Sequence, residues 1–415
     1  MSAQIDSKPT LIIPANQSLI FGISDTGTTP DRFVVWVLED SVEIAKLYLT
    51  PNTNNVSFFN LAEVVRDRVK VDDKIRDESA TLLSYSTLPF TTGRNGLKKY
   101  VVNVGSYDAG VESLTEDTDT VYLLDGVEQI SAGLHPSFAD YYPTASTVKG
   151  WLTDRIPVSD VITMEASDDD EGCVAFLNDS TIVGSLGAIL KIVVKNAAGW
   201  VLSTFYDTIN AANGAQLPSA ADINQKLTYF MILPKNLESW SSGVLSSNPT
   251  WDSYEVTIAN GALADKSNAF EIKRKCTQDK HKNTQLAWTN SLGGWDSVLF
   301  TGRTEHTDTV SSKPFRKDIG DWDASTYSFL PQARESAPYQ VTGNSSFSLI
   351  NIDFSFADIE LIKYAIRSDN LMMRAGASGE WMPVVIDTKS YNVKERFSGV
   401  FSVSLTVTLA QSLRC

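Results

Sequence analysis

The sequence contains few of the residues that build disulfide frameworks and metal centres. Among its 415 residues are three cysteines, Cys173, Cys276 and Cys415, and three histidines. The cysteines are too few and too widely spaced for a disulfide framework or a CxxC metal motif. No stretch approaches the roughly eighteen apolar residues of a membrane helix, and the first residues lack the pattern of a signal peptide. We therefore expect reduced thiols, synthesis in the cytoplasm and no membrane insertion.

Sequence motifs of catalysis are also missing. The chain has no GxSxG nucleophile elbow, no P-loop, no HExxH zinc motif and no Rossmann glycine pattern. The four consecutive acids at 168–171 lack the alternating oxygen ligands of a calcium loop. His306 lies between Glu305 and Asp308, but a metal site needs several ligands that converge in space. We expect no catalytic residue, no cofactor and no bound metal.

Positive charge is scarce as well. The chain has 35 basic and 50 acidic residues, a net charge of −15, which argues against nucleic acid as a main partner. Basic residues gather in one stretch, which we interpret either as a water-facing strand and loop or as a docking patch for an acidic surface of a neighbouring subunit. The candidate docking residues are Lys273, Arg274, Lys275, Lys280 and Lys282.

Alternation of apolar and polar residues with a period of two is the dominant pattern. In residues 401–409, Phe, Val, Leu, Val and Leu alternate with Ser and Thr, which predicts a strand with one buried face. Further short strands are predicted between clusters of turn residues, and this favours β-sandwich or barrel-like domains. They cover residues 32–39, 43–50, 98–107, 189–196, 227–234 and 254–260.

Only two segments have a helical pattern, so the predicted fold is mainly β and multidomain, with two short helices packed on sheets. In 59–69, Asn60 and Glu63 form a capping box, and in 354–368 Ser355 and Asp358 do the same. We predict an N-terminal β domain with one helix at 1–150 and a middle β domain at 151–262. A C-terminal β domain at 263–415 holds the second helix and a long polar segment, 301–340, which is either a functional arm or a loop ordered by a neighbour.

Residues 288–308 contain a predicted β-hairpin. The segments before and after Ser291–Gly294 have strand patterns, and glycine permits the positive φ of a tight turn. We expect positive φ at Gly293 and Gly294, and we expect Trp288 and Trp295 to anchor the strands by burial. The alternative is that the tryptophans are exposed anchors of an interface. No residue here is an evident nucleophile, acid or ligand, so the stretch is predicted to hold a shape.

The same hairpin carries a resemblance. "WTNSLGGWDSVLFTGR", with Asn290 two residues ahead of the Leu-Gly-Gly turn, resembles a phrase of virion structural proteins of tailed bacteriophages. Residues 56–69 and 347–409 are similar to the N-terminal strand-to-helix segment and to the ending of these proteins. The resemblance implies a non-enzymatic component of the tail, neck or baseplate that docks to other virion proteins and is located in the virion. A homo-oligomeric ring is the assembly we expect.

Two other hypotheses remain open. The nine tryptophans, the Asp321–Asp323 segment and the long polar loop are also compatible with a carbohydrate- or host-receptor-binding β-sandwich protein of the tail. A glycoside hydrolase would need two carboxyl groups facing each other across a cleft. Asp296, Asp321 and Asp323 are the candidates for that pair.

Overall fold

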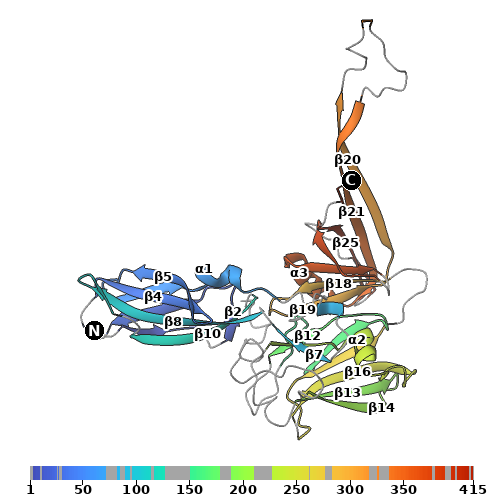
Figure 1. The fold of residues 1–415 in the computed structure, drawn as a ribbon. Coiled ribbons are helices and arrows are strands. Elements are labelled where there is room, and N and C mark those ends of the chain that lie inside the picture. The colour runs from blue at the N-terminus through green and yellow to red at the C-terminus, as the bar shows by residue number, and fades with distance from the viewer. Residues whose placement is uncertain are drawn as a thin grey trace. The chain divides into compact units, whose positions relative to one another are not determined.

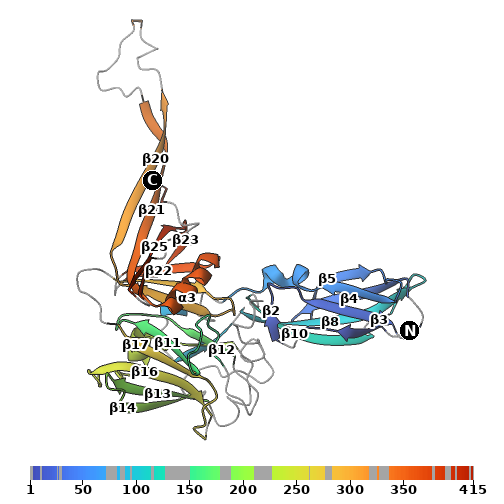
Figure 2. The same cartoon turned by 180° about the vertical axis from the view of Figure 1, so that it is seen from behind.

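The structure, a computed structural model, forms two compact units (Figures 1 and 2). Unit 1 comprises Met1–Thr277, Ala287–Leu299 and Glu360–Ser368, and unit 2 comprises Gln278–Leu286, Phe300–Ile359 and Asp369–Cys415. The three-domain division at about 150 and 262 stays a prediction. The described residues are 3–9, 12–25, 27, 30–71, 82–84, 89–93, 96–113, 116–126, 150–177, 188–209, 227–260, 262–275, 283–316, 325–326, 336–375, 379–387, 394–397, 400–410 and 413–414.

The N-terminal part of unit 1 contains two sheets around one apolar core. The strand orders are β1-β3-β6 and β2-β10-β8-β4-β5, with β9 paired to β8. Phe21 of β3 stacks on Phe59 of β6 at 5.2 Å between ring centroids, and Phe33 and Tyr100 are buried in the same core. The strands are β1 Ala3–Ser7, β2 Ile12–Pro14, β3 Ile20–Asp25, β4 Arg32–Glu39, β5 Val42–Leu49, β6 Val56–Asn60, β8 Leu97–Asp108, β9 Val111–Glu112 and β10 Asp117–Leu124.

A second pair of sheets in unit 1 encloses Trp151. Their orders are β11-β17-β16-β13-β14 and β12-β15-β7. The Trp151 ring makes edge contacts with Phe176, Phe230 and Phe270 at centroid distances of 5.4, 5.5 and 6.0 Å, so one indole joins strands from both sheets. The strands are β7 Phe90–Thr92, β11 Val161–Ala166, β12 Val174–Leu177, β13 Ala188–Asn196, β14 Val201–Ile209, β15 Leu227–Phe230, β16 Trp251–Ala259 and β17 Ala269–Arg274.

Unit 2 is built on one sheet in which five strands follow the order β22-β23-β25-β21-β20. The alternation in β25 works as predicted, because Val403, Leu405 and Val407 are buried on one side of the strand. β24 pairs with β25, and β26 pairs with β21. The strands are β20 Thr304–Arg316, β21 Ser336–Phe354, β22 Leu371–Ala375, β23 Met382–Ile386, β24 Lys394–Phe397, β25 Val400–Leu409 and β26 Leu413–Arg414.

The described part of the chain contains three short α-helices where the sequence predicted two. In α3 (Phe356–Arg367) the predicted capping box is present: Ser355 Oγ accepts the Asp358 N–H at 3.2 Å, and Asp358 Oδ2 accepts the Ser355 N–H at 3.1 Å. α1 (Ala62–Val65) is shorter than predicted and continues as the 3₁₀ turn η1 (Arg66–Arg68). A second 3₁₀ turn, η2, spans Leu82–Ser84.

Two details of the predicted helices and strands were wrong. The cap of α1 is Leu61 without a side-chain bond, because Asn60 Oδ1 accepts the N–H groups of Leu19 at 2.8 Å and Ala62 at 3.2 Å instead. The strand expected at 227–234 ends at Phe230, and α2 (Pro234–Trp240) follows with its proline in the first helical turn. The mainly β, multidomain fold class is confirmed. No helix among the described residues is long and apolar enough to cross a membrane.

Candidate structural site at the glycine hairpin

The predicted hairpin is formed by β18 (Thr284–Thr289) and β19 (Trp295–Phe300). The Asn290 N–H donates to the Gly294 carbonyl at 2.9 Å, which closes the turn. Gly293 has φ of +79°, and a Cβ there would lie 2.5 Å from the Asp125 carbonyl oxygen. The expectation of a positive φ at Gly294 was wrong, because of the two glycines in the turn Gly293 has a positive φ and Gly294 does not. Glycine is needed at position 294 because the Leu152 backbone lies close to it: a Cβ at this position would lie 2.6 Å from the Leu152 carbonyl oxygen.

The Asn290 side chain organises the turn from inside. Its Oδ1 accepts the N–H of Gly294 at 2.8 Å and that of Leu292 at 3.1 Å. Its Nδ2 donates to the Leu152 carbonyl at 2.8 Å and to Asp296 Oδ2 at 3.2 Å. Because Asn290 is buried, loss of these bonds would leave backbone groups unpaired away from water. Asn290 therefore joins the hairpin to residues 152–154, far away in the sequence.

Two buried aspartates complete this connection. Asp296 Oδ1 accepts the Thr153 hydroxyl at 2.5 Å, and its Oδ2 accepts the Asp154 N–H at 2.8 Å. In return, the Asp154 carboxyl accepts the N–H of Ser291 at 2.9 Å and also its hydroxyl. Each segment thus presents a carboxyl to backbone and hydroxyl donors of the other. We call Thr153, Asp154, Asn290, Ser291 and Asp296 the hairpin lock.

Burial raises the pKa values of both aspartates in the lock, and the repulsion between their charges adds to this effect at Asp154. Burial, with the negative charge of Asp296 added, raises the pKa of Asp154 to about 7. Burial also raises the pKa of Asp296, although the Arg155 guanidinium and the hydrogen-bond donors act in the opposite direction. The Arg155 guanidinium donates to the Ser297 carbonyl at 2.6 Å. Burial, and secondarily Asp296, raises the pKa of the buried Cys173 thiol, so this cysteine is held as an inert thiol.

The protein should therefore lose stability as the pH rises through neutrality. The folded pKa of Asp154 exceeds its unfolded value, so the folded state keeps a proton that the unfolded state releases from about pH 4 upward. The stabilising contribution is complete at low pH and is lost by about pH 7. Between pH 5 and pH 8 we expect a loss of about 2 kcal/mol from this group, measured by urea unfolding at both values.

Asp154→Asn should abolish most of this pH dependence, since the amide does not titrate. Asp252→Asn is the matched control, because Asp252 is an exposed aspartate of the same unit. If Asp154→Asn and the native protein show the same change in unfolding free energy between pH 5 and pH 8, Asp154 is not the group that titrates.

The lock has the properties of a structural element. Trp288 and Trp295 are 0% and 1% exposed, so neither indole is a surface anchor. Asp154, Asn290 and Asp296 are 6%, 4% and 5% exposed, which leaves no surface on which a substrate could meet the carboxyl pair. The sequence indicates Asn290 and Asp296 as candidates but not Thr153 and Asp154, because no local pattern in the sequence marks these two residues.

The candidate docking patch is only partly within the described residues. Lys273 forms an ion pair with Glu271 at 3.3 Å, and Lys275 with Glu165 at 2.6 Å. Lys280 and Lys282 lie outside the described residues. The described lysines of the patch are thus compensated by acids of the same sheet, and docking to an acidic neighbour stays a prediction.

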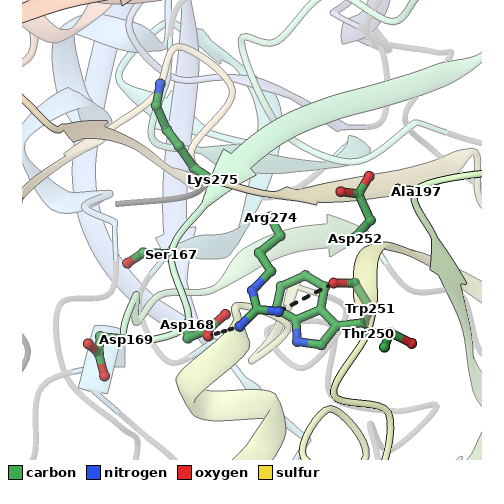
Figure 3. A pocket seen from close by; sticks show the side chains of 9 residues that line it. All are labelled: Ser167, Asp168, Asp169, Ala197, Thr250, Trp251, Asp252, Arg274 and Lys275. Carbon is green, nitrogen blue, oxygen red and sulfur yellow. Dashed lines mark hydrogen bonds and ion pairs between the residues drawn. The ribbon is translucent and has the colours of Figure 1, made fainter. Parts of the chain in front are cut away.

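Arg274 of the same patch lines a surface pocket of about 580 Å³ (Figure 3). The guanidinium lies over the Trp251 ring at 4.9 Å from its centroid and forms an ion pair with Asp168. Figure 3 shows Asp168, Asp169 and Asp252 around the same space. The Arg274 guanidinium thus contacts both the Trp251 ring and the Asp168 carboxylate, and these two contacts hold the end of β17 in place.

The remaining candidates of the sequence lie in different places. In the acidic run, Asp170 accepts the N–H and hydroxyl of Ser167 at 2.9 and 2.8 Å, which closes a turn. His306 Nε2 lies 2.9 Å from Asp308 and its ring stacks on Phe347. Within the described ranges there is no group of three or more His, Cys, Asp or Glu that could hold a metal ion. The Asp321–Asp323 segment lies outside the described residues.

Comparison with known proteins finds low structural similarity. Neither a protein-family model nor a curated protein matches the sequence. Two solved structures belong to gene transfer agents: a chain of the native virion at 11% identity and a chain of the tail of an empty particle at 13%. Each match covers 34% of this chain and 99% of that chain, with a TM-score of 0.20. A tandem repeat from the extending region of a large adhesion protein matches with a TM-score of 0.21 and 11% identity, over 84% of this chain and 69% of that chain. Similarity with TM-scores this low carries no argument about function.

Proposed function

We propose that the chain is a non-enzymatic structural component of a bacteriophage virion, which oligomerises in the tail, neck or baseplate and docks to other virion proteins. The observation that supports assembly most strongly is the outer part of β20 and β21 in unit 2. We call Val310–Arg316 of β20 with Ser336–Gly343 of β21 the ribbon. Figure 1 shows these two strands running past the other strands of their sheet.

The β20 strand of the ribbon is exposed along its whole length. β20 pairs with β21 from Thr304–Leu349 to Arg316–Ser336, whereas β25 reaches only Ser346 of β21. Residues 305–316 of β20 are all exposed. β26 pairs with β21 only at Thr342 and Gly343, so the rest of the ribbon has no third strand among the described residues. A two-stranded hairpin without a covering layer is marginally stable in water, so a partner that covers the ribbon would stabilise it.

β20 also ends the sheet order, so one of its edges faces no strand among the described residues. An unpaired edge is a template for another strand, and pairing there supplies main-chain hydrogen bonds. The edge is rich in Ser and Thr, and the net charge of −15 keeps free subunits apart in solution. These features suit a subunit that stays soluble until it meets its neighbours.

The hairpin lock supports the non-enzymatic part of the proposal. Asp154 and Asp296 are buried carboxyl groups that lie close enough for the charge of one to act on the other, and both are enclosed by hydrogen-bond donors. A glycosidase pair must face an open cleft wide enough for a sugar ring. Burial of Asp296 removes one of the three candidate acids of the hydrolase hypothesis.

The protein should be recovered as a regular component of tailed particles from its source. Gradient-purified particles, analysed by quantitative mass spectrometry, are expected to contain the chain in a fixed copy number relative to the other structural proteins. Washing with high salt should leave that number unchanged, as for a built-in subunit. Absence from purified particles, or removal by the wash, would contradict a structural role.

A further inference from the structure

Both strands of the ribbon have an edge without a neighbouring strand in the described part of the chain. β20 ends the sheet order, so its outer edge faces no described strand. On the other side of the ribbon, β25 reaches only Ser346 of β21, and β26 covers only Thr342 and Gly343. Figure 2 shows β20 and β21 continuing beyond β25. The β21 edge from Ser336 to Val341 is therefore open to a further strand.

The two open edges lie at the same level along the ribbon. The register places Ser312 opposite Val341 and Arg316 opposite Ser336, so the open stretch of β21 lies beside the outer part of β20. Because β20 and β21 are antiparallel, a strand with the direction of β21 continues an antiparallel ladder on the β20 edge. The β21 strand of a second copy in the same orientation has this direction. The ribbon is thus complementary to a second copy of itself.

The residues of both edges are compatible with strand addition. The whole of β20 within the ribbon is exposed, and so are Ser336 and Pro338 of β21. Pro314 and Pro338 are cross-strand partners, and neither has an N–H. Only alternate residues of an antiparallel strand direct their N–H to a given edge, so each proline removes at most one donor from its edge.

A head-to-tail arrangement covers more of the ribbon than a symmetric pair of copies does. If two copies met β20 to β20, each would still present its β21 edge to solvent, and an open edge is a template for further strands. When β20 of one copy meets β21 of the next, both edges of every inner ribbon are covered. A heterologous contact of this kind closes into a ring when the rotation between copies allows it.

We propose that the ribbons of successive copies pair head-to-tail, with the β20 edge of one copy against the Ser336–Val341 edge of the next. The inference rests on the proposed function, because it takes the ribbon as the assembly surface and names the surface that receives it. Copies joined in this way share one orientation, and their ribbons form a continuous antiparallel sheet.

Val341→Lys tests the β21 half of this contact. Val341 lies two residues from Gly343, the cross-strand partner of Val310, so the two valines are on the same face of the ribbon. Head-to-tail pairing predicts that Val341→Lys weakens self-association at least tenfold in sedimentation velocity. Val385→Lys is the matched control, since Val385 is 53% exposed on β23, an inner strand of the same sheet. It should assemble like the native chain, and circular dichroism melting checks that each variant is folded.

Disulfide trapping identifies the two edges that meet without an added charge. In chains that carry Cys276→Ser and Cys415→Ser, Ser312→Cys marks β20 of one chain and Val341→Cys marks β21 of another. The two chains are mixed as dilute solutions, concentrated and oxidised. We expect disulfide-linked dimers in the mixture and none from either chain alone.

Three results would overturn head-to-tail pairing: assembly of Val341→Lys like the native chain, linked dimers from the Ser312→Cys chain alone, or a mixture without linked dimers. If purified particles nevertheless contain the chain in a fixed copy number, the structural role stands and only the pairing of the edges is wrong. Absence of the chain from particles would contradict the proposed function itself.

Discussion

Trp288→Ala is expected to lower the free energy of unfolding by about 3 to 5 kcal/mol. The Trp288 side chain is fully buried in β18, a strand in which five of six residues are buried. Alanine would leave a cavity that the two strands of a closed hairpin cannot collapse to fill. Urea unfolding, followed by far-ultraviolet circular dichroism, measures the difference.

Trp288→Phe separates ring packing from the polar part of the indole. Trp288 Nε1 is buried and finds no hydrogen-bond acceptor among the described residues. Phenylalanine keeps most of the apolar volume and removes this unpaired donor, so it should cost far less than alanine. If phenylalanine and alanine are equally destabilising, the indole N–H has a partner and the account of Trp288 as a packing residue is wrong.

The alternating strands and the α3 cap could be predicted because their signals are local. The apolar residues of 401–409 occupy one side of β25, and the Ser355–Asp358 spacing is sufficient to form a capping box. The sequence does not predict α2, because Met231–Pro234 continues the apolar run of the predicted strand. Its proline begins a helix there, an outcome that tertiary packing decides.

Only the residues that the hairpin contributes to the lock could be predicted from the sequence. The glycine pair and Asn290 are visible in the sequence as turn residues, and the turn itself is local. Asp154 precedes Ser291 by 137 residues, and its role depends on the fold that brings the two segments together. Likewise, glycine at 294 is required by the Leu152 carbonyl, a contact that no local pattern contains.

Val310→Lys is expected to weaken self-association at least tenfold. Val310 is 68% exposed on β20 and pairs with Gly343 of β21, which has no side chain to cover it. A lysine on an edge strand opposes strand addition, because its charge would have to be desolvated in a continuous sheet. The fold should be retained, since the new side chain points into solvent in the free subunit.

Val42→Lys is the matched control for this substitution. Val42 is 65% exposed and lies on β5, which ends the larger N-terminal sheet as β20 ends the sheet of unit 2. The two variants therefore add the same charge to equally exposed valines of two end strands. A general effect of added charge would appear in both, and an effect of the ribbon in Val310→Lys alone.

Sedimentation velocity across a hundredfold range of concentration tests assembly through the ribbon most directly. The native chain and Val42→Lys are expected to form a closed oligomer of one defined size, with Val310→Lys remaining monomeric at concentrations where the others assemble. A native chain that stays monomeric over the whole range, or a Val310→Lys variant that assembles like the native chain, would contradict the claim.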